Sequence, residues 1–182
     1  MGRAEVIGVC VEAASEEGVP LLELFDYSQD LTDHCFSVMD IHTTAWMPAV
    51  LEAWGEGITG DDLFIISNLE IDRPYRGSSL GLFSMARLIQ TLGSGCGLVI
   101  IRSFPLLFDR RYKESHGSDE FTGTQEVANQ KREDHYARLG FEPLPKSDLM
   151  CLAPSLLSVS PESVGCPEHA MFELPFPASA SD

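Results

Sequence analysis

The segment from residue 62 to residue 152 alternates apolar runs with glycine turns in an order that strongly limits the fold. It predicts a strand at 62–71, a helix at 79–92, a buried strand at 98–102, a helix at 125–139, and two short strands at 141–144 and 148–152. Gly93 and Gly140 follow the two helices, at the position where glycine commonly ends a helix. Strands that alternate with helices indicate an α/β protein, with a mixed sheet and helices on its faces.

The first sixty residues carry weaker signals. Residues 5–14 form a run rich in β-branched side chains, which predicts a strand. Residues 21–27 fit either a second short strand or the start of a helix. Within residues 44–54, a four-residue spacing predicts one apolar face of a short helix, made of Trp46, Val50 and Trp54. Residues 155–182, rich in Ser and Pro, are expected to be a C-terminal tail after a single domain at 1–154.

Charge is distributed unevenly along this acidic chain. The sequence has 12 Lys and Arg against 28 Asp and Glu, a net charge of −16. Residues 4–72 contain 15 of the acids and no base, whereas residues 73–146 contain 11 bases and 8 acids. Such a balance argues against nucleic acid and anionic membranes as partners, because phosphate contacts dominate that binding. The first third could attract a cation and the middle could hold an anion, although a solvated acidic surface explains many of the acids equally well.

Cysteine and histidine do not indicate a metal site. The five cysteines are odd in number and form no Cys-x-x-Cys pair, which predicts reduced thiols in a cytoplasmic protein. The five histidines have no ligand spacing with cysteine or with each other. Cys35 beside His34 is disfavoured as a nucleophile and base, because adjacent residues rarely face each other. No apolar run approaches the roughly 20 residues of a membrane span.

The segment that carries chemistry lies between the strand at 62–71 and the helix at 79–92. It reads Arg76-Gly77-Ser78-Ser79-Leu80-Gly81. Glycines and small residues let backbone N–H groups approach a ligand, and the first turn of a helix has free donors and a partial positive charge. Together with Arg76 they predict an anion site suited to a pyrophosphate. On these residues alone, a tight turn with a helix cap is the commoner explanation.

This hexapeptide resembles the pyrophosphate loop of the GNAT superfamily, the acetyl-coenzyme-A-dependent N-acyltransferases, which usually reads Arg-Gly-x-Gly-hydrophobic-Gly. A second block of the family places a Tyr seven positions after an Asn, followed by Gly-Phe. Here that block is Asn129, Tyr136 and Gly140-Phe141. The resemblance covers about residues 60–152. The chain departs from the family at Ser79, where a glycine is usual, at Arg132, and in a longer gap before Asn129.

The resemblance implies a GNAT-like fold, a mostly antiparallel sheet with helices on both faces, and acetyl-coenzyme A as co-substrate. The coenzyme A half would span about 60–152 and the acceptor half about 1–60. On a strand splayed from its neighbour, pantetheine would pair with the backbone of Leu69, Glu70 and Ile71. The pyrophosphate would be held by the N–H groups of Arg76, Gly77, Ser78, Ser79, Leu80 and Gly81. Asn129 would bond the pantetheine region, with a helix N-cap as its alternative role.

The same resemblance implies direct acetyl transfer to a primary amine, without a covalent enzyme intermediate. Tyr136 is the candidate general acid for the coenzyme A thiolate. Asp62 is the favoured base, ahead of Asp61 and Glu70, although Asp62 could instead simply cap the start of its strand. The acidic first third favours a small cationic amine or a peptide amine as acceptor. A silent coenzyme-A-binding module and an acidic interaction protein remain the alternatives, and a homodimer is left open.

Overall fold

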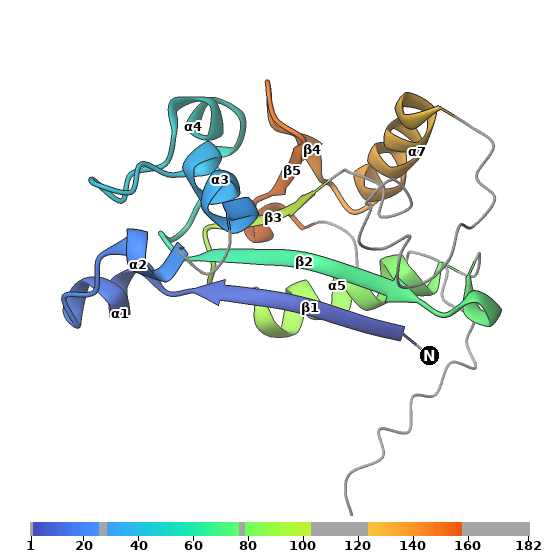
Figure 1. Cartoon of the computed structure of the whole chain (residues 1–182), viewed down its shortest axis with the longest axis horizontal. Coiled ribbons are helices and arrows are strands. Elements are labelled where there is room, and N and C mark those ends of the chain that lie inside the picture. The colour runs from blue at the N-terminus through green and yellow to red at the C-terminus, as the bar shows by residue number, and fades with distance from the viewer. Residues whose placement is uncertain (1, 26–28, 77–78, 103–123, 158–182) are drawn as a thin grey trace, which may run out of the picture.

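The computed structural model describes residues 2–25, 29–76, 79–102 and 124–157. Its centre is a five-stranded sheet in the order β1-β2-β3-β5-β4 (Figure 1). The strands are β1 (Gly2–Val9), β2 (Leu63–Ile71), β3 (Leu98–Arg102), β4 (Glu142–Pro143) and β5 (Leu149–Leu152). The helices are α1 (Val11–Glu16), α2 (Leu21–Phe25), α3 (Gln29–Val38), α4 (Pro48–Trp54), α5 (Leu80–Leu92) and α7 (Gln125–Ala137), with short 3-10 turns η1 (Arg73–Tyr75) and η3 (Pro154–Leu156).

The sheet is mixed and mostly antiparallel. β1 pairs with β2 antiparallel along its whole length, from Gly2 opposite Ile71 to Val9 opposite Leu63. β2 and β3 are parallel and are joined through α5, while β5 is antiparallel to both β3 and β4. A parallel pair needs a long crossover, and the apolar helix α5 supplies it. The expected α/β class, a mixed sheet with helices, is therefore confirmed.

β2 loses its parallel partner halfway along. The β2–β3 register runs only from Leu63–Leu98 to Ile66–Ile101, yet β2 continues to Ile71 beside β1. A shift in the β1 register between Glu5 and Val6 leaves Ser67 as an extra residue at this point, a β-bulge. Bulges bend and twist a strand. From residue 67 to Ile71, then, the edge of β2 that faces away from β1 has no strand beside it within the parts of the chain described.

Alternating side chains of the sheet supply two apolar cores, one on each face. On one face, residues of β2 and β3 such as Leu63 and Ile65 pack with α1, α2, α3 and α4. On the other, Phe64 and Ile66 pack with α5 and α7. β3 reads as a continuous apolar run because both of its faces are buried. Full burial of each such side chain stabilises the fold by about 1.5–3 kcal/mol.

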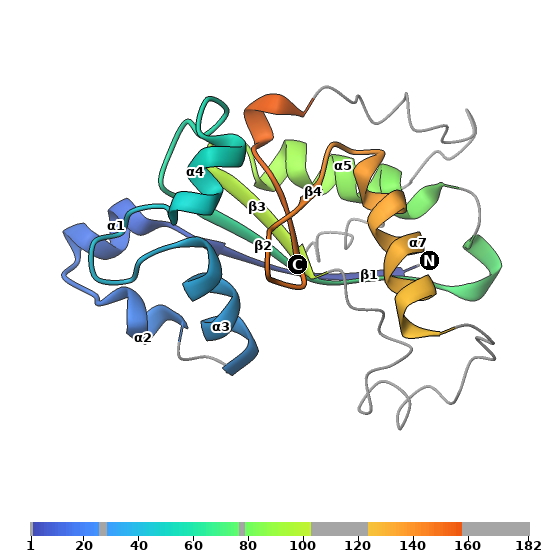
Figure 2. The same cartoon turned by 90° about the horizontal axis from the view of Figure 1, so that it is seen from above.

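The two ends of β2 have different surroundings. Figures 1 and 2 show α1 to α4 gathered at the end where β2 begins, and α7 at the end where β2 leads into η1 and α5. Both tryptophans, Trp46 and Trp54, are buried in the first of these regions, and the Trp46 indole donates a hydrogen bond to the Gly60 carbonyl at 3.3 Å. The predicted pyrophosphate loop belongs to the second region.

Two expectations for the first forty residues need correction. The strand expected at 5–14 begins earlier, ends at Val9, and gives way to helix α1. The corner between them forms where the Val11 N–H donates to the Asp62 carboxylate, a long-range contact that local β-propensity cannot reveal. Residues 21–27, left open between strand and helix, contain the helix α2. Helix α3 was not anticipated, and the apolar face that it buries is small: Leu31, Cys35 and Val38.

The remaining elements follow the expected order closely. β3 occupies the predicted residues, and α5 begins one residue late. α4 buries Val50 and Trp54 as the spacing predicts, but it begins only at Pro48, so Trp46 precedes the helix and forms a β-bridge with Met39 instead. Residues 103–123 and most of the predicted tail lie outside the described residues. None of the helices described in the structure is both long and apolar enough to cross a membrane.

Candidate functional site

The loop from Ile71 to Gly81 connects the free part of β2 to the start of α5. The Arg76 side chain folds back along it, and its Nε donates to the Ile71 carbonyl at 2.7 Å. Ser79 is the N-cap residue of α5, and its carbonyl accepts from the Phe83 N–H at 3.0 Å. Gly77 and Ser78, which the sequence places in the centre of the loop, lie outside the described residues. The helix start, its orphan N–H groups and the open strand edge therefore adjoin one another.

Ser79 adopts a left-handed conformation, with φ 59° and ψ 5°. This is the position where the resembled family usually has glycine, the residue that adopts positive φ without steric cost. An L-residue in this region costs about 1–2 kcal/mol. The backbone shape of the loop is thus one that glycine favours, even though serine occupies the position.

Substitution of Ser79 by glycine is expected to stabilise the protein by about 0.5–1 kcal/mol, because relief of the left-handed strain exceeds the added freedom of the unfolded chain. Urea unfolding measures this as a higher midpoint at unchanged slope. Ser84→Gly in the interior of α5 is the matched control and should lose about 0.5 kcal/mol. Equal losses in both variants would contradict the strain argument.

The first turn of α5 has a second glycine, Gly81. A Cβ added there would meet Ile71 Cγ1 at 3.6 Å, an ordinary van der Waals distance, and beyond the helix itself no other atom of the described residues lies within 4 Å. The protein itself therefore has room for alanine at this position. Glycine in a helix is less favourable than alanine by roughly 0.5–1 kcal/mol, so packing within the chain does not account for Gly81.

The predicted pantetheine residues form the free part of β2. On the β1 side, Leu69 is opposite Ala4, Glu70 opposite Arg3, and Ile71 opposite Gly2. Leu69 packs against the core formed with α5 and α7, and Ile71 lies against Gly81. The resemblance implies a strand splayed from its parallel neighbour before the loop. In the described residues β2 and β3 pair as far as Ile66 and Ile101, and residues 103–123, which follow β3, lie outside them. The backbone edge of β2 beyond Ile66 can pair with an extended amide-bearing ligand in the manner of an added strand.

α7 carries the second block of candidate residues. Thr124 is its N-cap and accepts from the Val127 N–H, so the alternative role of Asn129 as a helix cap is wrong. Asn129 sits one turn further on, and its buried Oδ1 has no hydrogen-bond donor among the residues that the structure describes. Leaving a buried acceptor unpaired costs about 1–3 kcal/mol. The uncompensated oxygen is a candidate contact for a bound N–H group.

Tyr136 lies near the end of α7 and is only 8% exposed. It packs in the same core as Ile66 and Met85, with the Phe141 ring at a centroid distance of 6.1 Å. Burial raises the pKa of the Tyr136 phenol above its usual value, against a smaller opposing influence of Arg132. The phenol is therefore neutral and able to donate a hydrogen bond across the ordinary pH range.

His135 contacts the Tyr136 ring edge-on, with centroids 5.6 Å apart. Desolvation lowers the pKa of the His135 imidazole, and the positive charges of Arg138 and Arg132 lower it further. The neutral imidazole is thereby favoured near neutral pH. We do not assign His135 a part in the chemistry, because its ring only flanks the tyrosine.

Asp62 is not brought to the loop. It precedes β2, and nine residues of strand, about 30 Å, separate it from the Ile71 end. Its Oδ1 accepts from the Val11 N–H at 2.8 Å, and its carbonyl accepts from the Gly97 N–H at 2.8 Å. These bonds fasten the β1–α1 corner and the start of β3 to β2, which is the structural role that the sequence left open. Glu70 is the predicted carboxylate that lies beside the loop.

Sequence reasoning missed Asn68. It stands on β2 immediately after the bulge, opposite Glu5 on β1. Like that of Asn129, its Oδ1 is buried and has no hydrogen-bond partner within the described parts of the chain. Asn68 belongs to no sequence motif. The burial of its side-chain oxygen depends on the tertiary structure, so the sequence alone could not reveal it.

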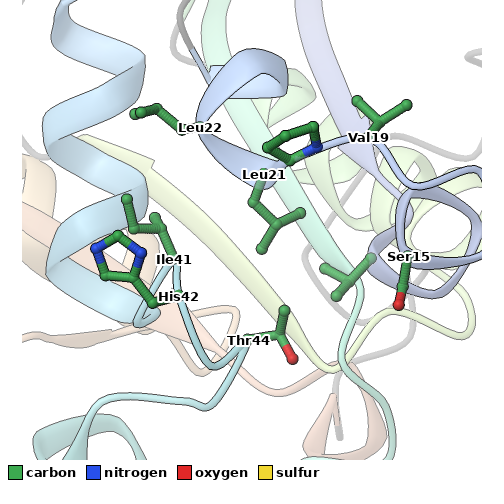
Figure 3. Close-up of a pocket in the computed structure, with 9 residues that line it drawn as sticks. Ser15, Val19, Leu21, Leu22, Ile41, His42 and Thr44 are labelled. Atoms are coloured by element: carbon green, nitrogen blue, oxygen red, sulfur yellow. The ribbon is translucent and has the colours of Figure 1, made fainter.

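Two cavities lie away from these residues. One, of about 440 Å³, opens between α1, α2 and the loop after α3 (Figure 3), and is lined largely by apolar side chains with His42, Ser15 and Thr44 at its wall. The other, of about 320 Å³, lies between the end of α5 and η3 and includes Cys96. Neither contains a residue of the predicted site. The first of them shows that the N-terminal region has a concave surface of its own.

The thiols and possible metal ligands give no competing centre in the described ranges. Burial raises the pKa of both Cys35 and Cys151 to about 12, which keeps these two thiols protonated. The candidate pairing of Cys35 with histidine therefore lacks an available thiolate. Among the residues whose placement is described, no three or more His, Cys, Asp or Glu side chains are grouped so as to hold a metal ion.

Comparison of the chain with models of protein families, with curated protein sequences and with solved structures found no match. The candidate site is therefore defined by the sequence and the structure of this chain alone. The free edge of β2, the start of α5 and the orphan oxygen of α7 are the features on which a functional proposal can rest.

Proposed function

We propose that the chain is an N-acetyltransferase of the GNAT type, which moves an acetyl group from acetyl-coenzyme A to a primary amine. The observation that carries this proposal is that residues 67–71 of β2 continue beyond the last described pair with β3, Ile66–Ile101, and lead towards the start of α5 at Leu80. An open strand edge offers amide partners for pantetheine, and the adjoining helix start offers N–H donors for pyrophosphate. A single ligand with an anionic end and an amide-bearing arm fits both features at once.

Each end of coenzyme A has candidate partners in the proposal. The pyrophosphate is held by backbone N–H groups of the loop that leads to Gly81, with Arg76 at its edge. The pantetheine arm lies along Leu69, Glu70 and Ile71, where its amides pair with the strand. The Asn129 Oδ1 accepts from a pantetheine N–H, which would satisfy an oxygen that has no donor in the described structure.

The reaction is direct transfer. The nitrogen lone pair of the acceptor attacks the thioester carbonyl carbon, a C–N bond forms, and an N–H group of the free strand edge stabilises the tetrahedral oxyanion. The C–S bond then breaks, and the sulfur leaves with the bonding electron pair. Tyr136 Oη donates its proton to that sulfur, a role supported by the neutral state that burial gives the phenol.

The proton lost by the amine needs a base near the free edge of β2. The position of Asp62 at the far end of the strand favours Glu70, the weaker candidate by sequence, for this part. A water chain ending in bulk solvent is the other route that the open edge permits. Because Asp62 lies far from the loop, the site lacks the base that the sequence favoured. This also favours the alternative of a silent coenzyme-A-binding module, which needs the cofactor contacts but no base.

Calorimetry with acetyl-coenzyme A, followed by coenzyme A release with a panel of polyamines, aminoglycosides, amino acids and basic peptides, tests the proposal. Binding and turnover with at least one amine are expected. Binding without turnover on any amine would favour the silent module. No binding at all would overturn the proposal and favour the acidic interaction protein.

Salt should distinguish charged from neutral acceptors. Fifteen acids and no base between residues 4 and 72 attract a cationic amine over a Debye length of about 10 Å at 0.1 M salt. Raising ionic strength from 20 to 500 mM is expected to lower kcat/KM for a polyamine by roughly 3–10-fold, by screening the attraction. A neutral amine of similar size is the control. Equal salt dependence for both would contradict electrostatic steering.

A further inference from the structure

Strand β1 forms one edge of the sheet. β2 lies on one side of it, and no other strand of the described chain lies on its other side (Figure 1). Proteins commonly protect such an edge with a very short strand, with Pro or Lys, or with a bulge. β1 runs for eight residues and contains neither Pro nor Lys, and the extra residue of the bulge, Ser67, belongs to β2. The outer edge of β1 is therefore a regular template to which another strand can bind.

Two opposite charges stand on one face of this edge strand. Val6 packs with the core of α5 and α7, and side chains alternate along a strand. Arg3 and Glu5 therefore both project to the other face, and both are exposed. On the β2 side, Arg3 is opposite Glu70 and Glu5 is opposite the neutral Asn68. A strand added on the outer side would thus meet an arginine and a glutamate on the same face.

These charges fit a second copy of the same strand in one register. Facing residues of an antiparallel pair direct their N–H and C=O groups either both toward each other or both away, and the direction alternates along each strand. Two identical strands therefore pair about a two-fold axis that passes through a residue. An axis through Ala4 sets Arg3 of each copy opposite Glu5 of the other. An axis through Arg3 or Glu5 would oppose two like charges, and an axis through Val6 would set Glu5 opposite the apolar Ile7.

We propose that residues 2–6 of β1 pair antiparallel with the same residues of a second copy of this chain, about a two-fold axis through Ala4. The axis is normal to the sheet, so the two sheets join into one and α5 of both copies lies on the same face. Backbone hydrogen bonds hold the two strands together, and two ion pairs between Arg3 and Glu5 set the register. The pairing needs no coenzyme A, so it is independent of the proposed acetyl transfer.

Sedimentation equilibrium of the full chain measures this association. So short a pairing belongs with the weak interfaces that bury less than about 1,200 Å² in total, and a Kd of roughly 10–100 μM is therefore expected. The net charge of −16 repels two copies at long range, so the measurement is made in 0.15 M salt, where the Debye length is about 8 Å. A chain that stays monomeric at about 500 μM under these conditions would overturn the proposal.

Two charge reversals test the register. In Arg3→Glu both contacts become glutamate against glutamate, and in Glu5→Arg both become arginine against arginine. Each variant alone should therefore dimerise at least about tenfold more weakly than the wild type. In an equimolar mixture the acidic strand of one variant faces the basic strand of the other at both positions, so a mixed dimer should form with a Kd within about threefold of the wild-type value. Association of the mixture also shows that both variants are folded.

Glu142→Arg is the matched control, because it reverses the charge of an exposed residue in β4, the strand at the opposite edge of the sheet. This variant should dimerise with a Kd within about twofold of the wild-type value. A dimer that is lost in Glu142→Arg and kept in Glu5→Arg would overturn the proposal, because the interface would then lie at β4. Single variants that dimerise as tightly as the wild type, or a mixture that associates no better than its components, would overturn the pairing about Ala4.

Discussion

Tyr136→Phe is expected to reduce kcat by roughly 100-fold or more, because the variant lacks the hydroxyl that gives a proton to the departing sulfur. The ring itself stays, so packing against Phe141 and the core with Ile66 should be retained. The calorimetric Kd for acetyl-coenzyme A should therefore change by less than about threefold. Stopped assays of coenzyme A release and calorimetry on the same preparation measure the two quantities.

The pH profile adds an independent readout for the same residue. Burial raises the pKa of Tyr136 above its ordinary value near 10. The proton-donating form, and the stability that the folded state gains from the neutral phenol, are fully present below pH 10 and are lost as pH rises through the higher folded-state value. Wild-type kcat should fall in that alkaline range. Tyr136→Phe should lack this fall. A Phe variant with wild-type kcat would assign the proton to another donor.

Gly81→Ala is expected to separate stability from ligand binding. The added Cβ fits against Ile71 at 3.6 Å, so alanine should stabilise α5 by about 0.5–1 kcal/mol. In the proposal the pyrophosphate approaches the start of this helix, where an added methyl group would take up space. Overpacking of this kind costs about 1–3 kcal/mol. Acetyl-coenzyme A affinity should therefore fall roughly 10- to 100-fold by calorimetry, while the urea midpoint rises.

Gly8→Ala supplies the matched control for this experiment. Gly8 is in β1, and a Cβ built there meets no atom within 4 Å. Its substitution should leave acetyl-coenzyme A affinity unchanged. A Gly81→Ala protein that binds as tightly as the wild type would mean that the start of α5 does not touch the ligand, and the proposed cofactor site would have to be abandoned.

The sequence predicted correctly those helices and strands whose ends are determined by neighbouring residues in the sequence. Gly93 is the C-cap residue of α5, and the apolar run of β3 is long enough for a strand and too short for a helix. α7 ends earlier than expected, at Ala137 with Arg138 as its C-cap, three residues before Gly140. β2, α5 and α7 were therefore placed within a residue or two. The loop between β2 and α5 was predicted as an anion site from residues that are contiguous in the sequence. Its central two residues lie outside the described chain, so their part in binding stays a prediction.

The errors arose where distant residues decide the local structure. The strand expected through Ala14 stops at Val9 because Asp62 binds the Val11 N–H across 51 positions of sequence. The same contact removes Asp62 from its expected place at the site. α3 was missed because Thr, Asp, His and Ser interrupt its narrow apolar face. Asn68 could not be found by spacing, since its interest lies in the surroundings of one oxygen atom.

The placement of the two tryptophans has a practical consequence for experiments on this molecule. Trp46 and Trp54 are the only indoles in the chain, and both are enclosed by α1 to α4, a full strand length from Arg76. Their fluorescence emission thus reports whether that half of the molecule is folded, and a ligand seated beside Arg76 should leave it unaltered. A change in tryptophan emission on adding acetyl-coenzyme A would indicate that binding near Arg76 causes a conformational change that is transmitted along β2 to the tryptophans.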